Sequence, residues 1–188
     1  MPHIEKPRYL QEYNPKEALT IINDLQILWL LYFTWARAAF LGRLFNVPTM
    51  IPAQNQLKNL PSDFYNILRR FYGDELSQQF QNYLINRNDL EANIINAMIS
   101  KDQDAVDLYS REYIKNAETI AEFLGEFAFW DERQWKTYLY KDINLFFEEI
   151  RTLLAGDFEK EADVFRRELD NAMEMGRYMA AGIVRDIR

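Results

Sequence analysis

The sequence predicts an all-α fold, a single up-and-down helical bundle of five long helices and one short helix with the first helix at its centre. All six prolines lie at or before Pro61, so the rest of the chain lacks the residue that most disrupts helices. Glycine is scarce there, and strong helix formers dominate. Hydrophobic residues make up 48% of the 188 residues, which is enough to fill the core of one domain.

The first long helix is predicted from Pro15 to about Phe45. Asn14 is its expected N-cap, and Pro15 suits the first helical position because its missing amide hydrogen is not needed there. We interpret residues 1–14 as a polar N-terminal arm and residues 15–188 as a single helical-bundle domain.

Prolines, glycines and capping residues mark the remaining boundaries. Residues 46–61 contain three prolines and are predicted to form a loop, and the short helix is expected at 62–72, where Gly73 ends it. No internal repeat is evident along the chain. Four further long helices are expected at about 74–100, 102–125, 131–155 and 157–188, with Asp102 and Asp131 as N-caps.

The stretch from Ile27 to Phe45 is apolar on every side of the predicted helix, and its length alone permits a membrane span. Arg37 and Arg43 lie inside it, and a charge near the bilayer centre costs at least ~2.5 kcal/mol. The other helices carry apolar stripes that need covering, which favours a central core helix over a span. With no secretory signal visible, we expect a soluble cytoplasmic protein.

Charge and rare residues exclude several classes of function. The net charge of −7 argues against nucleic acid as the main partner, because phosphate binding requires a basic surface. The chain has no cysteine, and its single histidine, His3, lies in the predicted arm. Thiolate sites, histidine-dependent triads and di-iron Glu-x-x-His motifs are therefore not expected unless the arm folds back, and we predict no metal or cofactor. An all-carboxylate site for a hard cation remains open in principle.

Several polar residues occupy helical positions that otherwise belong to the apolar face. At roughly 100° per residue, Arg87 falls in the middle of the apolar face of its helix, and Asp142 falls on that of the helix from Asp131. Arg37 lies in the apolar stretch and also needs a partner if it is buried. We interpret the following residues as an inward polar cluster: Arg37, Arg87, Glu91, Asn116, Glu118, Asp142 and Glu149.

Two ion pairs are predicted within this cluster. Arg87 and Asp142 are expected to meet, because an unpaired buried charge is prohibitively unfavourable. Arg37 is expected to pair with Glu149 or with Glu118. Two interpretations of the cluster stay open, a structural ion network and the remnant of a ligand site.

Short motifs spread over nearly the whole chain resemble a group of small uncharacterised bacterial proteins, common in Firmicutes, whose members often carry unrelated enzyme names. Their order and spacing carry the resemblance, which implies an all-helical fold but no reaction. The motifs are "LW" at Leu28–Trp29, "WAR" at Trp35–Arg37, "FYG" at Phe71–Gly73, "NAETIAEFL" at Asn116–Leu124, "LY" at Leu139–Tyr140 and "GD" at Gly156–Asp157.

The resemblance also implies a location for a site. In that family, three histidines lie on three helices, and they correspond to Tyr32, Arg87 and Asp142 in this chain. None of the three is a histidine here, so the resemblance, which implies a metal or polar site in the family, implies a shared polar locus without those histidines in this chain. Tyr32 accordingly joins the candidate cluster.

Three hypotheses about function follow. The leading one is a non-catalytic helical bundle that acts through binding or assembly, with a homo-oligomer as one form of assembly. The alternative is a binding protein or an enzyme that uses the inward cluster to bind a metal or a small anionic ligand, since arginine pairs suit carboxylate and phosphate. The third is a membrane-associated protein that uses the first helix.

Overall fold

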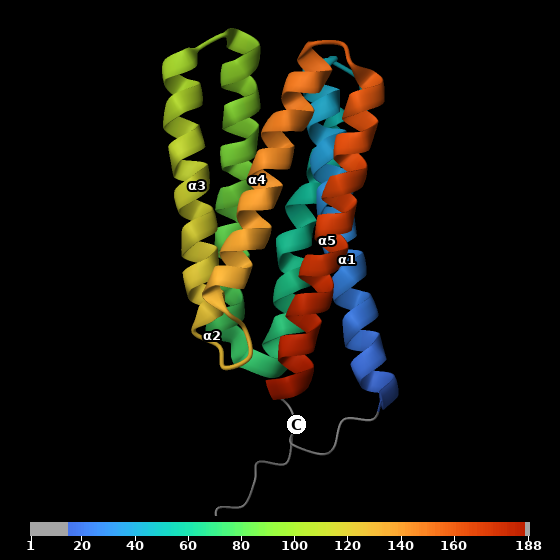
Figure 1. Cartoon of the computed structure of the whole chain (residues 1–188), viewed down its shortest axis with the longest axis vertical. Helices are drawn as coiled ribbons and strands as arrows, with labels where there is room; N and C mark the ends of the chain where they lie inside the picture. The colour runs from blue at the N-terminus through green and yellow to red at the C-terminus, as the bar shows by residue number, and fades with distance from the viewer. Residues whose placement is uncertain (1–14, 187–188) are drawn as a thin grey trace, which may run out of the picture.

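The computed structural model describes residues 15–186 and contains helices but no strand within that range, which confirms the predicted all-α class (Figure 1). The predicted N-terminal arm, with His3, lies outside the described residues. The five helices are α1 (Pro15–Leu44), α2 (Met50–Ser100), α3 (Gln103–Gly125), α4 (Glu132–Leu154) and α5 (Phe158–Asp186).

The helices form a closed ring in chain order, because α5 packs against α1 as well as against α4. The central position predicted for the first helix is not confirmed, since α1 packs mainly against α2 and α5. Ile27 and Leu31 on the outer side of α1 are 54% and 40% exposed. The apolar side chains of α1 therefore fill the core on one side of the helix and are exposed at the molecular surface on the other.

By length and composition alone, α1 is also the one described helix that is apolar enough to cross a membrane, over Lys16–Leu44. This is weak support for a span, because the core helix of a soluble protein passes the same test and 44% of the most apolar window is buried.

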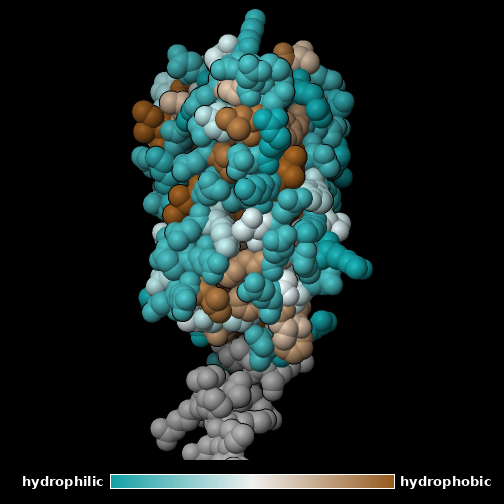
Figure 2. Space-filling view, turned by 90° about the vertical axis from the view of Figure 1, so that its left-hand side faces the viewer, coloured by the Kyte–Doolittle hydropathy of each residue, from teal (hydrophilic) through white to brown (hydrophobic). Residues whose placement is uncertain are grey.

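The face of the molecule on the side of α3 is largely hydrophilic, with small separate apolar patches (Figure 2).

The long helix α2 folds back on itself at Gly73, where φ is 79° and ψ is 178°. The rings of Phe64 and Phe80 lie 5.8 Å apart, although 16 residues of straight helix would separate them by about 24 Å. The two halves of α2 therefore run in opposite directions, as Figure 1 shows at the lower end of the bundle. The chain consequently forms three helical hairpins: α1 with the first half of α2, the second half of α2 with α3, and α4 with α5.

The prediction that residues 46–61 form a loop is wrong, because most of this stretch belongs to α2. Pro52 lies in the first helical turn, where its amide needs no intrahelical partner, and Pro61 is accommodated inside the helix. The predicted short helix at 62–72 is the last part of this first half and is not a separate element. Its predicted end at Gly73 coincides with the observed turn.

Substitution of Gly73 is expected to destabilise the fold through backbone strain alone. Its conformation belongs to a region that is essentially restricted to glycine, and an added Cβ would meet nothing within 4 Å. We expect Gly73→Ala to lower the free energy of unfolding in urea by about 1–3 kcal/mol. Asn66→Ala, at an exposed position of the same half-helix, should change it by less than about 0.5 kcal/mol. Equal stability of the two variants would show that the turn accepts a side chain.

The three hairpins are structural repeats with a spacing of 55 residues, although no repeat is evident in the sequence. The connection inside each hairpin contains one residue with positive φ. Successive residues of this kind are 55 positions apart: Asn46 (52°), Lys101 (57°) and Gly156 (74°). In each hairpin the next amide donates to a carbonyl at the end of the preceding helix at 2.9 Å. The pairs are Val47 with Gly42, Asp102 with Ala97, and Asp157 with Thr152.

Side-chain contacts follow the same interval in the second and third hairpins. Asn116 Nδ2 donates to the Tyr83 carbonyl, and Asn171 Nδ2 donates to the Tyr138 carbonyl, both at 3.1 Å. Each asparagine thus ties the second helix of its hairpin to the first. The first hairpin departs from this pattern, because Pro61 stands at the position equivalent to these asparagines.

Candidate functional site

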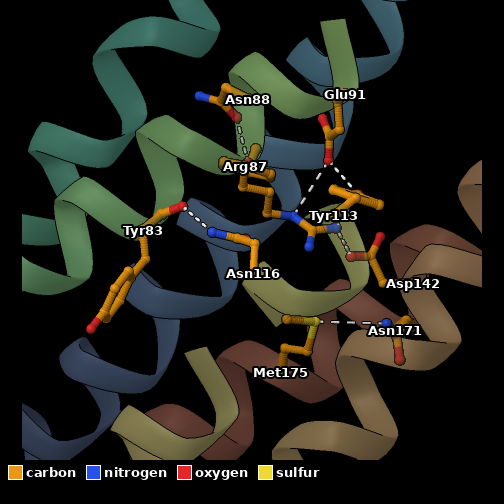
Figure 3. A network of polar contacts seen from close by, with 10 residues as sticks. Tyr83, Arg87, Asn88, Glu91, Tyr113, Asn116, Asp142, Asn171 and Met175 are labelled. Carbon is orange, nitrogen blue, oxygen red and sulfur yellow. Dashed lines mark hydrogen bonds and ion pairs between the residues drawn. The ribbon is translucent and has the colours of Figure 1, made fainter. Parts of the chain in front are cut away.

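The first group of buried charges is the Arg87 cluster, which consists of Arg87, Glu91, Tyr113 and Asp142. Arg87 is 1% exposed, and its Nη2 donates to the Asp142 carboxylate and to the Tyr113 hydroxyl (Figure 3). Its Nε lies 3.4 Å from Glu91 Oε1, and the Tyr113 hydroxyl donates to the same oxygen at 2.6 Å. The predicted ion pair between Arg87 and Asp142 is confirmed.

Burial and charge act against each other in this cluster. Burial raises the pKa of Asp142 to about 7, although the neighbouring Arg87 works in the opposite direction. Burial likewise raises the pKa of Glu91 above its ordinary value, again opposed by Arg87. For Arg87, burial favours the neutral form, but the charges of Asp142, Tyr113 and Glu91 outweigh it and hold the pKa above its ordinary value. Arg87 therefore remains the fixed positive charge of the cluster.

The second group is the Arg37 cluster, which consists of Arg37, Glu149, Glu161 and Glu168. Arg37 Nε donates to Glu149 Oε1 at 3.0 Å and to Glu161 Oε1 at 2.7 Å, and its Nη2 also donates to Glu161. The Arg37 guanidinium lies 4.4 Å above the ring of Phe165, in cation–π geometry. This cluster joins α1 to α4 and α5, and it confirms Glu149 as a partner of Arg37.

Two predicted members of the polar cluster lie elsewhere. Glu118 does not meet Arg37, because it faces the surface between α3 and α4, where it accepts a hydrogen bond from the Tyr140 hydroxyl at 2.7 Å. Asn116 is buried beside the Arg87 cluster, but its amide is used to tie α3 to the Tyr83 carbonyl (Figure 3). Its role is therefore to pack the hairpin together.

Sequence reasoning missed three polar residues that complete the clusters: Tyr113, Glu161 and Glu168. Tyr113 lies on an apolar face, where a tyrosine usually only packs. Glu161 and Glu168 lie in a helix rich in exposed acids, so they do not stand out by type. Their seven-residue spacing puts them on one face of α5, and Glu168 shares that face with the buried Ala172 and Met175. That register is the signal that identifies them as inward residues.

The buried carboxyl groups outnumber the buried guanidinium groups. The carboxyl groups are Glu91, Asp142, Glu149, Glu161 and Glu168, whereas Arg87 carries the one buried guanidinium among the described residues and the side chain of Arg37 is 26% exposed. Burial raises the pKa of Glu168 well above its ordinary value, and the charge of Glu149 adds to this effect. Burial also raises the pKa of Glu149, and the neighbouring Glu161 adds to this effect. The core thus retains protons that carboxyl groups in water release.

A small cavity lies between the two clusters. Its volume is about 10 Å³, close to the space of one water molecule, and its lining includes Tyr32, Glu91, Asp142, Glu149 and Glu168. Glu149 Oε2 has no hydrogen-bond partner within the described chain. Because residues of both clusters line this cavity, it connects them into one polar interior.

Tyr32, Arg87 and Asp142, which the family resemblance assigned to one locus, do lie together. The hydroxyl of buried Tyr32 donates to Asn88 Oδ1, and the charges of Arg87 and Asp142 act on its pKa, which burial raises well above the ordinary value. The three residues occupy equivalent positions of the three hairpins, since they are spaced by the 55-residue repeat.

The arrangement of acidic side chains does not suit a metal ion. Within residues 15–186, no group of three or more histidine, aspartate or glutamate side chains is arranged to hold one. Glu149 and Glu161 are instead both engaged by Arg37.

An open pocket reaches this interior from the side of α1 and the two halves of α2. Its volume is about 170 Å³, and Glu91 lines both the pocket and the small internal cavity. Six of the lining residues are apolar, and the other six carry charged or amide groups. The pocket is lined by Ala36, Ala39, Phe40, Arg43, Gln54, Leu57, Lys58, Asn88, Asp89, Glu91, Ala92 and Ile95.

Three alanines make room for this pocket: Ala36 and Ala39 in the first hairpin and Ala92 in the second. The other two hairpins carry larger side chains at these positions. The equivalents are Glu91 and Phe146 for Ala36, Ile94 and Glu149 for Ala39, and Arg37 and Phe147 for Ala92. The contact that is filled by side chains elsewhere in the ring is left open here.

Comparisons with known proteins supply no further constraint on this site. No family model, curated protein or solved structure matches the chain. The assignment of function accordingly depends on the geometry of the pocket and of the two ion clusters.

Proposed function

We propose that this chain is a non-catalytic cytoplasmic protein that binds a small molecule in the pocket between α1 and the two halves of α2. The observation that carries the proposal is the position of Glu91. This buried carboxylate belongs to the Arg87 cluster and also lines the open pocket, so a ligand there contacts the polar core directly.

The two arginines themselves do not favour an anionic ligand. Arg37 and Arg87 are each engaged by carboxylates of the chain, and a ligand anion would have to compete with these carboxylates. The pocket, by contrast, has space that needs no rearrangement of the core. The net charge of −7 supports a small ligand over nucleic acid as the partner.

Ala92→Phe provides a direct test, because it places in the pocket the side chain that the equivalent Phe147 carries. A panel of small acids, amines, amino acids and sugars is screened by thermal unfolding of the wild type and of this variant. A ligand at one hundred times its Kd should stabilise the wild type by about 2.7 kcal/mol and Ala92→Phe much less. Ala162→Phe, at an exposed position of α5, is the control and should respond like the wild type. If no compound distinguishes Ala92→Phe from the control, the pocket does not bind and the proposal fails.

Assembly is the second candidate function, and an exposed apolar cluster favours it. The cluster lies where the α1–α2 and α4–α5 connections meet at one end of the bundle, and the rings of Phe45 and Phe158 are 6.3 Å apart. Sedimentation of the purified protein as a monomer at high concentration would remove a homo-oligomer from consideration. The exposed residues of this cluster are Phe45, Val47, Ile51, Leu154 and Phe158.

A further inference from the structure

We infer that the pocket beside Glu91 takes a small apolar zwitterion, the chemical class of the aliphatic α-amino acids. This inference rests on the proposed binding function and specifies its ligand. It draws on the charges that line the pocket, the character of its walls and its volume.

The charged groups of the pocket are balanced in sign. Arg43 and Lys58 are cations, and Asp89 and Glu91 are carboxylates. Among residues 15–186, none of Arg43, Lys58 and Asp89 has an ion-pair partner within 4 Å. A ligand with only a negative charge would face both carboxylates, and a ligand with only a positive charge would face both cations. A ligand that carries one charge of each sign offers a counter-charge both to the cations and to the carboxylates.

Glu91 adds a fixed point to this arrangement. Its Oε1 already accepts the Tyr113 hydroxyl and lies 3.4 Å from Arg87 Nε, so the carboxylate is held in place. A carboxylate can accept further hydrogen bonds through its second oxygen. An ammonium group is a suitable donor to this oxygen, because ligand and protein charges then compensate each other at a mostly desolvated position.

The walls and the volume define the rest of the ligand. Apolar side chains line the pocket on all three helical segments, with Phe40 on α1, Leu57 on the first half of α2 and Ile95 on the second half. The volume of about 170 Å³ compares with roughly 150 Å³ for an apolar cavity that admits benzene. A branched aliphatic side chain fits this space against the apolar residues of the lining.

The test compares leucine with two analogues that each lack one charge, by calorimetric titration of the full chain. The analogues are 4-methylpentanoate, which lacks the amine, and 3-methylbutylamine, which lacks the carboxylate. We expect leucine to bind at least about tenfold more tightly than either analogue. Equal or tighter binding of one analogue, or no binding of leucine, would overturn the assignment to zwitterions. In that case the proposed function still stands or falls separately, on whether any compound distinguishes Ala92→Phe from its control.

Charge deletions in the pocket then identify which group of the ligand each residue meets. Lys58→Gln is expected to weaken the binding of leucine and of 4-methylpentanoate by about threefold or more and to leave the binding of 3-methylbutylamine unchanged. Asp89→Asn should weaken the binding of leucine and of 3-methylbutylamine and leave the binding of 4-methylpentanoate unchanged. Both positions are exposed, so neither variant should impair folding. Lys115→Gln and Asp63→Asn, at exposed positions outside the pocket, are the matched controls. Deletions that affect all three probes equally, or none, would contradict the inference.

Discussion

Asp142→Ala is expected to lower the free energy of unfolding by about 3–5 kcal/mol, the range for removal of one partner from a buried ion pair. Asp142 is 3% exposed and accepts a hydrogen bond from Arg87, which is 1% exposed. Without the aspartate, Arg87 keeps only Tyr113 and the more distant Glu91 at 3.4 Å. Because Arg87 keeps these two partners, we expect a loss near the lower end of this range. The measurement is urea unfolding at pH 8, where Asp142 is mostly ionised because its pKa is about 7.

Two variants show whether this loss comes from a stranded charge. Arg87→Met combined with Asp142→Leu removes both charges, so it should cost much less than Asp142→Ala alone. Glu174→Ala removes an exposed carboxylate that lies 3.7 Å from Lys141, and it should cost less than about 1 kcal/mol. If Asp142→Ala is no more destabilising than Glu174→Ala, the buried pair does not stabilise the bundle in the way described.

Much of the fold could be predicted because helix limits depend on local sequence. Asp102 and Asp131 cap their helices as expected, accepting from the amides of Ala105 at 3.0 Å and Gln134 at 2.9 Å. Pro52 was misinterpreted because proline is excluded from a helix interior but accepted in a first turn, and Pro61 was misinterpreted because α2 accommodates it in its interior against that general tendency. The position of α1 in the ring could not be predicted, since an apolar helix suits a centre and a partly exposed wall equally well.

The candidate site was predictable where a charge interrupts an apolar stripe. Arg87 and Asp142 stand out in this way, and the structure brings them together. The repeat remained hidden because equivalent positions carry different residue types, as Tyr32, Arg87 and Asp142 do, while burial is what recurs. The pocket was hidden for a related reason, since it depends on small residues contributed by two hairpins. A single alanine such as Ala92 gives no signal until its equivalents, Arg37 and Phe147, are known.

The protein is expected to lose stability as the pH rises from about 5 to about 8, because its core retains protons on carboxyl groups. The pKa values of Asp142, Glu149 and Glu168 are all raised, mainly by burial, from ordinary values of 3.8 for aspartate and 4.5 for glutamate. Above pH 5 the unfolded chain has released these protons and the folded chain still holds some of them. Folding then requires proton uptake, so each such group disfavours the folded state by up to about 1.4 kcal/mol per pH unit until its folded pKa is passed.

Glu168→Gln isolates this effect, because glutamine keeps the shape and a hydrogen-bond donor but cannot ionise. The free energy of unfolding of the wild type, measured in urea, should fall by about 2–4 kcal/mol between pH 5 and pH 8, and that of Glu168→Gln should fall by less. The variant should therefore be as stable as the wild type near pH 5 and more stable than the wild type at pH 8. Asp163→Asn, at an exposed position of the same helix, should keep the wild-type slope. A wild-type stability that rises with pH over this range would mean that the unfolded chain holds more protons than the folded one, so that the buried carboxyl groups of α4 and α5 are already ionised in the folded protein.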